Sequence, residues 1–254
     1  MNLLIDIGNT FTHIGLGAEK RIGYDFKFPT HEKIGGPQVL EKLKGYRSKI
    51  SFAAISSVVP HKTDFWIKFI SKYFGIKPLI INANIFLPIK IKNKGENSIG
   101  SDRICTAVAG YFLFKRKSNV IAIDLGTATT YNVVLKNGDF LGGIISLGIE
   151  TSAKALNFNT EKLPLLTPRQ LLFPRRVIGR NTLEAIQSGI MYSASFSIDG
   201  MVNQIEKECR RKFKIVLTGG NCRRMYRRTT HKARLEKYLV LLGLNHILHY
   251  NIMV

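Results

Sequence analysis

Two short polar turns in this chain carry residue types that can hold phosphate groups. One is DIGNT at residues 6–10 and the other is DLGTATT at residues 124–130, and each follows an apolar run that predicts a buried strand. Glycine lets a backbone approach a ligand closely, and successive N–H groups with Asn and Thr side chains can cradle phosphate oxygens. The aspartate at each strand end, Asp6 or Asp124, is placed to hold a cation or its waters beside those oxygens.

Each turn alone is also a common tight-turn sequence with no ligand. Two copies in matching positions, together with Thr218-Gly219-Gly220 after a third apolar run, instead favour a site for nucleotide phosphates. The chain has neither a Walker A motif nor GxGxxG, which disfavours the P-loop and Rossmann modes of phosphate binding.

The elements that must position these turns form two similar halves. Each half opens with a strand that ends in one of the turns, and hairpin strands and helices follow it. We therefore expect two α/β domains, residues 1–117 and 118–254, which face each other across a cleft. The strands are expected at residues 3–7, 11–27, 51–59, 78–82, 120–125, 131–135, 139–145 and 213–217. The helices are expected at residues 32–43, 62–74, 101–115, 149–158 and 181–212. A loop is expected at 84–98, and a mixed helical tail after residue 220.

The composition is that of a folded protein with one large or two small domains. The 254 residues are 45% hydrophobic and 22% charged, which excludes wholesale disorder. Three scattered cysteines are too few for a disulfide framework and fit a reducing, cytoplasmic compartment. No apolar run approaches a membrane span and the N-terminus lacks a signal-peptide pattern, so no membrane association is expected. The net charge of +21 would attract polyanions and phosphorylated ligands, without identifying one.

The motifs occur in the order found in type III pantothenate kinases, so the chain resembles that family over nearly its whole length. The most specific part is GSDR at residues 100–103 followed by DLGTATT. The resemblance implies a duplicated actin/hexokinase/Hsp70-like (ribonuclease H-like) fold and a homodimer that phosphorylates pantothenate with ATP, the first step of coenzyme A synthesis. It also implies magnesium with the nucleotide and a monovalent cation, potassium or ammonium. The segments that carry the resemblance are residues 6–10, 56–60, 100–103, 124–130, 142–145, 181–182 and 218–220.

Asp102 stands at the start of the expected helix 101–115, beside Arg103. From the residues alone, a carboxylate in this place is typical of a helix cap, and the arginine is typical of a surface salt bridge. The resemblance implies that Asp102 is the catalytic base, which accepts the proton of the pantothenate hydroxyl as that oxygen attacks the γ-phosphorus of ATP. Arg103 should keep this carboxylate ionised at pH 7, and could bind the substrate carboxylate or a phosphoryl oxygen.

The resemblance gives the remaining site residues three roles. Asp6 would orient the magnesium–phosphate unit, and Asp124 would contact the monovalent cation, which offsets its repulsion from the phosphates. Thr182 matches a threonine that binds pantothenate from across the dimer interface, although from the residues alone it is equally a helix N-cap. The ATP-binding residues are then Asp6, Ile7, Gly8, Asn9, Thr10, Thr127, Gly219 and Gly220, and the substrate-binding residues are Gly100, Ser101, Asp102, Arg103 and Thr182.

Three positions depart from the family pattern. Asn93 stands where the family carries a tyrosine, so an aromatic wall for pantothenate is missing or supplied elsewhere. Ser101 replaces the customary alanine, and Leu147 stands where a proline is common. These changes bear on substrate affinity more than on phosphate transfer. They leave open a related phosphotransferase with another substrate.

The basic excess gathers toward the C-terminal end of the chain. Residues 207–237 hold twelve Lys and Arg against Glu208 and Glu236, a net charge of +10. A solvated face explains such a stretch, and so does a polyanion-binding patch. A nucleic-acid-binding or transcription accessory protein on the same fold is therefore the alternative function. It is not favoured, because a pure binding protein has no need for the Asp102–Arg103 pair, and aromatic residues for base stacking are sparse in the stretch.

Overall fold

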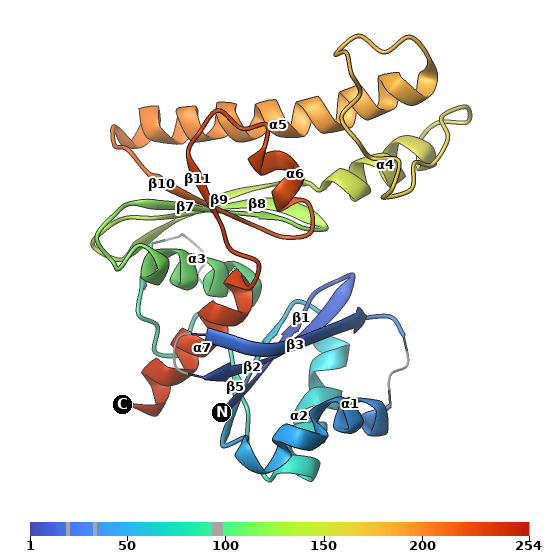
Figure 1. Ribbon diagram of the computed structural model, residues 1–254. Coiled ribbons are helices and arrows are strands. Elements are labelled where there is room, and N and C mark those ends of the chain that lie inside the picture. The colour runs from blue at the N-terminus through green and yellow to red at the C-terminus, as the bar shows by residue number, and fades with distance from the viewer. Residues whose placement is uncertain (19–20, 33–34, 93–98, 254) are drawn as a thin grey trace. The chain divides into compact units, whose positions relative to one another are not determined.

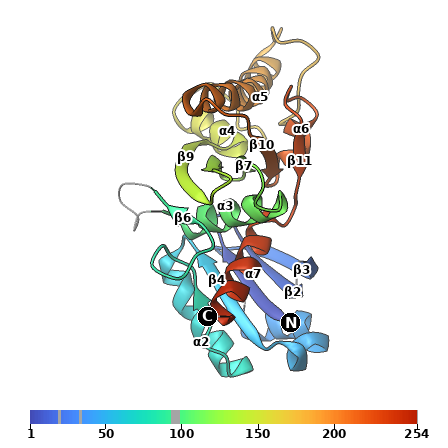
Figure 2. The same ribbon diagram turned by 90° about the vertical axis from the view of Figure 1, so that its left-hand side faces the viewer.

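The chain folds into two compact units (Figures 1 and 2). The computed structural model describes residues 1–18, 21–32, 35–92 and 99–253. Unit 1 consists of Met1–Arg116, Asn137–Gly142 and Tyr238–Val254, and unit 2 consists of Lys117–Lys136 and Gly143–Lys237. The C-terminal segment therefore belongs with the first unit, and the expected domain boundary at 117/118 stays a prediction.

Unit 1 is built on a five-stranded sheet in the order β3-β2-β1-β4-β5. The central strand β1 pairs antiparallel with β2 and parallel with β4, and β4 pairs parallel with β5. Leu3, Ile5 and Ile7 of β1 are fully buried, as expected of an apolar strand that is covered on both faces. The strands are β1 (Asn2–Ile7), β2 (Phe11–Ala18), β3 (Arg21–Pro29), β4 (Phe52–Ser57) and β5 (Leu79–Ile80).

Helices cover both faces of this sheet. The alternation of large apolar residues and glycines in β2 allows helices to pack on each face. Ile14 and Leu16 join the core that includes α1 and α2, whereas Gly15 and Gly17 face α7 on the other side. A Cβ on Gly15 would lie 2.7 Å from the side chain of Leu241, so the glycine allows α7 to lie close to the sheet. The helices of unit 1 are α1 (Gly36–Leu43), the 3-10 helix η1 (Lys44–Lys49), α2 (Pro60–Phe74), α3 (Ser101–Leu113) and α7 (Leu239–Ile252).

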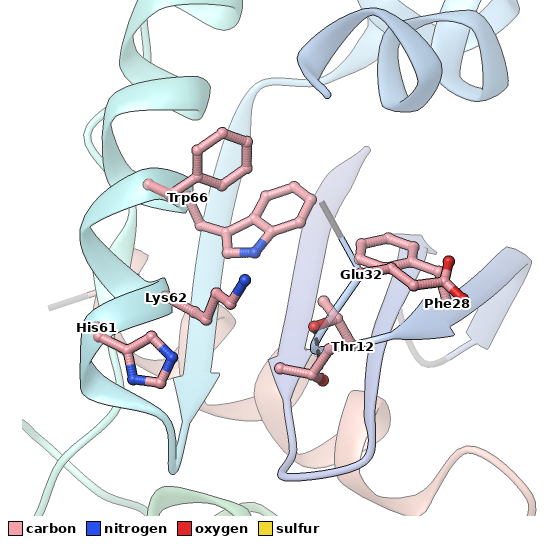
Figure 3. Close-up of a pocket in the computed structure, with 8 residues that line it drawn as sticks. Thr12, Phe28, Glu32, His61, Lys62 and Trp66 are labelled. Atoms are coloured by element: carbon pink, nitrogen blue, oxygen red, sulfur yellow. Dashed lines mark hydrogen bonds between the residues drawn. The ribbon is translucent and has the colours of Figure 1, made fainter. Parts of the chain in front are cut away.

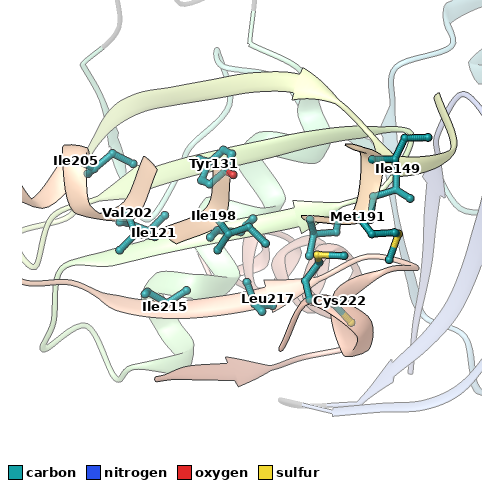
Figure 4. Close-up of a cluster of buried hydrophobic side chains, with 14 of the residues drawn as sticks. Ile121, Tyr131, Ile149, Met191, Ile198, Val202, Ile205, Ile215, Leu217 and Cys222 are labelled. Atoms are coloured by element: carbon teal, nitrogen blue, oxygen red, sulfur yellow. The ribbon is translucent and has the colours of Figure 1, made fainter. Parts of the chain in front are cut away.

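The second sheet has the strand order β11-β10-β7-β8-β9-β6, and unit 2 holds most of it. Ile121 and Ile123 of β7 pack into a buried cluster with Ile149 of α4 and with Ile198 and Val202 of α5 (Figure 4). The strands are β6 (Lys90–Ile91), β7 (Val120–Leu125), β8 (Ala128–Val134), β9 (Asp139–Leu147), β10 (Lys214–Thr218) and β11 (Ala233–Leu235), and the helices are α4 (Ile149–Phe158), α5 (Thr182–Cys209) and α6 (Cys222–Tyr226).

The two sheets repeat one topology. Strands β1 to β5 lie in the order 3-2-1-4-5, and strands β7 to β11 lie in the order 9-8-7-10-11. In each sheet the first strand forms an antiparallel hairpin with the second and pairs in parallel with the fourth. The expectation of two similarly folded α/β halves is thus confirmed, strand by strand.

The longest of the described helices, α5, spans 28 residues and buries one side, with apolar side chains exposed on the other. Asn181 caps its start, because the Asn181 side chain accepts a hydrogen bond from the Glu184 N–H at 2.9 Å. Arg210 ends it in the left-handed conformation, with φ of 50°. Its buried side, which includes Ile190, faces the second sheet. No helix in the described part of the chain is long and apolar enough to cross a membrane.

Most predicted elements are confirmed, and the differences have local causes. The helix expected at 32–43 begins only at Gly36, because Gly35 takes an extended conformation and its N–H donates to the Gln38 side chain. The expected loop at 84–98 contains the short strand β6, and the tail contains β11; strands of two or three residues show no alternation that a sequence could reveal. Asn93 lies outside the described residues.

The contact between α3 and α7 gives a test of the packing of unit 1. A Cβ on Gly243 of α7 would lie 2.0 Å from the Cys105 carbonyl oxygen of α3, so Gly243→Ala should lower the free energy of unfolding by about 1–3 kcal/mol. Gly200→Ala in α5 is the matched control: its Cβ meets nothing within 4 Å, and alanine should raise the helix stability by about 0.5–1 kcal/mol. Urea denaturation measures both; equal effects of the two substitutions would contradict the close helix contact.

Candidate active site

The first turn closes between β1 and β2. The Gly8 N–H donates to the Phe11 carbonyl at 3.1 Å, so this N–H is already used within the turn. Ile7 is fully buried in the core, so its side chain is not available to a ligand. It contributes to the site only by anchoring the end of β1. Asn9 is exposed at the tip of the turn. The surface that a phosphate group would meet is therefore centred on Asn9, not on the whole motif.

Thr30, just after β3, braces this turn from behind. The Thr30 hydroxyl donates to the Gly8 carbonyl at 2.7 Å, and the Thr30 N–H donates to the Thr10 carbonyl at 2.9 Å. Its Oγ1 also lies 3.1 Å from Oγ1 of Thr12. The threonine is 3% exposed, so these bonds are shielded from water and fix the backbone on both sides of Asn9.

A chain of hydroxyl groups connects Asp6 to the start of α3. Asp6 lies opposite Ser56 in the parallel pairing of β1 with β4, and the Ser56 hydroxyl donates to Asp6 Oδ1 at 3.0 Å. Oγ of Ser56 lies 3.1 Å from Oγ of Ser101, the first residue of α3. Ser101 Oγ also accepts the Ser57 N–H at 2.8 Å. The predicted residues Asp6 and Ser101 are thus brought together at one edge of the sheet.

Asp102 lies in the first turn of α3, held against its own helix. Its Oδ1 accepts the Arg103 N–H at 2.8 Å. A Cβ on Gly100 would lie 2.5 Å from the same oxygen, so only glycine leaves room for the carboxylate there. The cap position belongs to Gly100, and Asp102 is not the capping residue. The interpretation of Asp102 as the N-cap is therefore wrong, although its carboxylate does accept a backbone N–H of the first turn.

Burial dominates the electrostatics of the Asp102–Arg103 pair. Desolvation raises the pKa of the Asp102 carboxyl, while the Arg103 N–H and the Arg103 charge lower it and offset only part of the shift. Burial also lowers the pKa of the Arg103 guanidinium, and the Asp102 charge opposes this. Arg103 therefore moderates the basicity of Asp102, and the carboxylate is a stronger base than an exposed one.

A pocket of about 450 Å³ opens at the start of α3, and Asp102 is not among the residues that line it. Ser57, Gly100 and Ser101 line it together with Asn82 and Asn84. The two asparagines form a turn in which Asn82 Oδ1 accepts the Asn84 N–H at 2.8 Å. Sequence reasoning placed them at a strand end and in a loop and gave them no role, although amide side chains spaced by one residue after a strand are a usable signal.

The second turn closes between β7 and β8 in unit 2. The Gly126 N–H donates to the Ala128 carbonyl at 3.1 Å. The Thr127 carbonyl accepts the Gly148 N–H at 3.1 Å and the Thr151 hydroxyl at 2.6 Å, so the start of α4 holds the turn. Thr127 itself is exposed, as a residue that meets a phosphate should be.

The third motif, TGG at residues 218–220, lies directly against the second turn. Thr218 is opposite Asp124 in the pairing of β10 with β7. Gly219 has φ of 87°, and a Cβ there would lie 2.4 Å from Asp124 Oδ1, so the position requires glycine for both conformation and space. Gly220 is exposed, and a Cβ there would meet nothing within 4 Å. Unit 2 therefore brings Asp124, Gly219 and Gly220 together.

Thr182 is the first residue of α5 and is exposed. The cap of this helix is Asn181, so the alternative interpretation of Thr182 as the N-cap is wrong. Thr182 lines a separate pocket of about 540 Å³ with Gly179, Arg180 and Leu156, among others. None of the residues of the second turn lines that pocket.

The carboxylates beside the two turns suit a cation whose other ligands are phosphate oxygens and waters. Across the residues with described positions, no group of three or more His, Cys, Asp or Glu could hold a metal ion. Magnesium bound to nucleotide phosphates keeps several waters and takes one or two carboxylates. Asp6 at the first turn fits that requirement, and Asp124, beside the backbone of the second and third motifs, is a carboxylate that a monovalent cation could join.

Two repeated sheets of one topology, each with a polar turn after its first strand, define a fold of the duplicated actin/hexokinase class. Among solved structures, the hexokinase of the ROK family from Thermus thermophilus has the same fold, with a TM-score of 0.54 and 15% identity, over 98% of this chain and 99% of that one.

Sequence comparison defines the family. A profile of the type III pantothenate kinase family matches residues 2–204, and the chain belongs to this family. The type III pantothenate kinase of Sulfurihydrogenibium sp. (strain YO3AOP1) is 34% identical over 96% of this chain and 98% of its own length. That of Syntrophobacter fumaroxidans is 32% identical over 99% of this chain and 98% of its own. The fold and family expected from the sequence are confirmed.

The raised pKa of Asp102 predicts a cost in stability. An acid whose pKa is raised by folding destabilises the folded state once it is ionised, and this cost vanishes as pH falls below its unfolded value of about 3.9. Asp102→Asn keeps an oxygen for the Arg103 N–H and removes the charge, so it should raise the free energy of unfolding at pH 7. The gain should shrink steadily as the pH is lowered.

Urea denaturation across this pH range measures the effect, with Asp64→Asn on the exposed face of α2 as the matched control. A variant that is no more stable than the wild type at pH 7, or a gain that grows as the pH falls, would show that Asp102 carries no burial penalty.

Proposed function

We propose that this chain transfers the γ-phosphoryl group of ATP to the primary hydroxyl of pantothenate, the first step of coenzyme A synthesis. Membership of the type III pantothenate kinase family supports the reaction, and Mg²⁺ with ATP follows from the kinase class. The observation that carries the proposal is the placement of Asp102 in the first turn of α3, directly after Gly100 and Ser101, which line the 450 Å³ pocket.

Asp102 acts as the general base. Its burial raises its pKa, which makes the carboxylate a better proton acceptor while its bond from the Arg103 N–H fixes its direction. The acceptor hydroxyl lies in the 450 Å³ pocket, where Asn82 and Asn84 offer amide groups to the hydroxyl, amide and carboxylate of pantothenate. Arg103 pairs with negative charge on the substrate or the transferring phosphoryl group.

The two turns hold the nucleotide. Asn9 and Thr10 of the first turn and Thr127 of the second contact phosphate oxygens, and Gly219 and Gly220 let the adenine and ribose lie close to the backbone. Asp6 would hold Mg²⁺, which when bound neutralises phosphate charge. The hydroxyl bonds from Asp6 through Ser56 to Ser101 keep the cation ligand in register with the helix that carries the base.

Asp124 belongs to the site of a monovalent cation, potassium or ammonium. Gly219 leaves the space beside Asp124 Oδ1 free of side-chain atoms, and the strand-end backbone supplies carbonyl oxygens of the kind that potassium takes. Such a cation reduces the repulsion between the carboxylate and the phosphates of ATP. The monovalent cation stays bound beside Asp124 throughout the phosphoryl transfer.

The protein acts as a cytoplasmic homodimer in this proposal, through unit 2. Large apolar side chains there are strongly exposed: Ile178 is 82% exposed, Phe196 is 60% exposed and Leu183 is 40% exposed. Monomeric proteins seldom leave such groups in water, so a second copy is the natural cover. Thr182 lies among them and serves the pantothenate site of the other subunit. No nucleic-acid or membrane partner is part of this function, and the basic residues 207–237 form a solvated face.

The reaction is tested by ATP turnover with pantothenate. Wild-type protein should release ADP only when pantothenate is present, and Asp102→Asn should lower kcat about 10²–10⁴-fold because proton transfer loses its acceptor. ATP binding, measured by calorimetry, should stay within a factor of about three, since the turns are untouched. Asp64→Asn should turn over like the wild type.

Full turnover by Asp102→Asn would exclude the proposed base. ADP release with another alcohol but not with pantothenate would instead show a related phosphotransferase. The cation is tested in the same assay: replacement of potassium by sodium should lower turnover of the wild type, and equal rates in both salts would exclude the role of Asp124.

The dimer is tested by sedimentation. Phe196→Asp places a charge on the exposed face of α5 and should convert the dimer to monomer without unfolding it, because Phe196 is 60% exposed. Phe86→Asp, at a position 66% exposed in unit 1, is the control and should leave the dimer intact. A wild-type protein that sediments as a monomer at all concentrations would exclude this part of the proposal.

A further inference from the structure

A second pocket of unit 1 has no role in the proposed reaction. It has a volume of about 330 Å³ and lies between the start of α2 and the neighbouring strands β2 and β3 (Figure 3). It lies on the face of the sheet that packs against α1 and α2, because Thr12 shares that face with Ile14 and Leu16. Its lining residues are Thr12, Phe28, Thr30, Glu32, His61, Lys62, Phe65 and Trp66.

Trp66 gives this pocket a fixed hydrogen-bond donor. The side chain is 3% exposed and is held by a stacked contact with Phe28 at 5.9 Å and edge contacts with Phe65 and Phe69 at 5.3 and 5.4 Å. Its indole N–H donates to no acceptor among the described residues, and the nitrogen atom is not fully buried, so it can be reached from the pocket. Figure 3 shows this nitrogen on the side of the ring that faces Lys62. An N–H that faces a pocket and is unsatisfied by the protein is available to donate to a ligand or to water.

Lys62 supplies a charge next to that donor. Its ammonium group points toward the indole nitrogen in Figure 3, and no carboxylate with a described position forms an ion pair with it. Two adjacent donors with a single positive charge match the two oxygens of one carboxylate. A phosphate group carries about two negative charges and three acceptor oxygens at neutral pH, and this donor set would satisfy it poorly.

The hydroxyl groups at the base of the pocket act as an acceptor. The single proton of the Thr30 hydroxyl is donated to the Gly8 carbonyl at 2.7 Å. The Thr12 hydroxyl, 3.1 Å away, must then donate its own proton to Thr30, which leaves lone pairs of Thr12 facing the pocket. A ligand can therefore offer a hydroxyl or amino group to Thr12 while its carboxylate meets Lys62 and Trp66.

We propose that this pocket binds a small aromatic carboxylate. The rings of Phe28, Phe65 and Trp66 form apolar walls suited to a planar body, and aromatic rings prefer such offset or edge contacts. Lys62 and the Trp66 N–H take the carboxylate. Glu32 and His61, both exposed, also line the pocket, and the Glu32 carboxylate disfavours ligands with more than one negative charge.

Trp66 makes the test direct, because it is the only tryptophan of the chain. The full-length protein is titrated with benzoate, 4-hydroxybenzoate, benzamide and inorganic phosphate while tryptophan emission is recorded, and calorimetry repeats each titration without an optical signal. Both carboxylates should bind with a saturable change in emission. Benzamide, which keeps the ring and lacks the charge, and phosphate, which keeps charge and lacks the ring, should each bind at least about tenfold more weakly.

Lys62→Gln should raise the Kd for benzoate about tenfold or more, whereas Lys68→Gln, an exposed position on the same helix that does not line the pocket, should leave it unchanged. Circular dichroism checks that both variants are folded. The absence of saturable binding by either carboxylate, equal affinity for benzoate and benzamide, or equal Kd values in Lys62→Gln and the wild type would each overturn the proposal. Kinase turnover is not a readout here, so failure of this site leaves the proposed reaction standing.

Discussion

The site depends on the pairing of parallel strands inside each repeat. Because β4 lies parallel to β1, and β10 parallel to β7, the segments that follow these strands emerge at the edge where the polar turns lie. This pairing sets Asp6 opposite Ser56 and Asp124 opposite Thr218. A slip of one residue in either pair would turn these side chains to the other face of the sheet. The apolar strand cores, which are buried on both faces, make such a slip costly.

The start of α3 shows how the fold raises the pKa of one carboxyl group. Ser101 ties the helix to the end of β4, and Gly100 leaves the space that the Asp102 carboxylate occupies. Both features place the acid where water is scarce, so its charge is costly and its affinity for a proton is high. The arginine beside it limits this effect without abolishing it. Under the proposed function, the stability that burial of Asp102 costs is the source of its strength as a base.

The fold and the motif residues could be predicted because their signals are local in sequence. Apolar runs that end in DIGNT and DLGTATT mark strand and turn within ten residues, and the repetition of that unit indicates two equivalent halves. The residues that complete the site could not be found this way. Thr30 holds the first turn from twenty-two positions away, and Ser101 reaches Ser57 across forty-four, so their roles depend on pairing that no local pattern encodes. The late start of α1 and the short strands β6 and β11 could not be predicted for a different reason. One capping residue, or a pairing of two or three residues, gives no periodic pattern in the sequence.

The two polar turns are copies of one design, yet they are not the same size. Four residues separate the paired Ile7 and Thr12 in the first hairpin, and three separate the paired Leu125 and Thr129 in the second. The extra residue makes the first turn longer than the second. The two halves thus share one framework, and a single residue of loop length distinguishes the polar turn of the first half from that of the second.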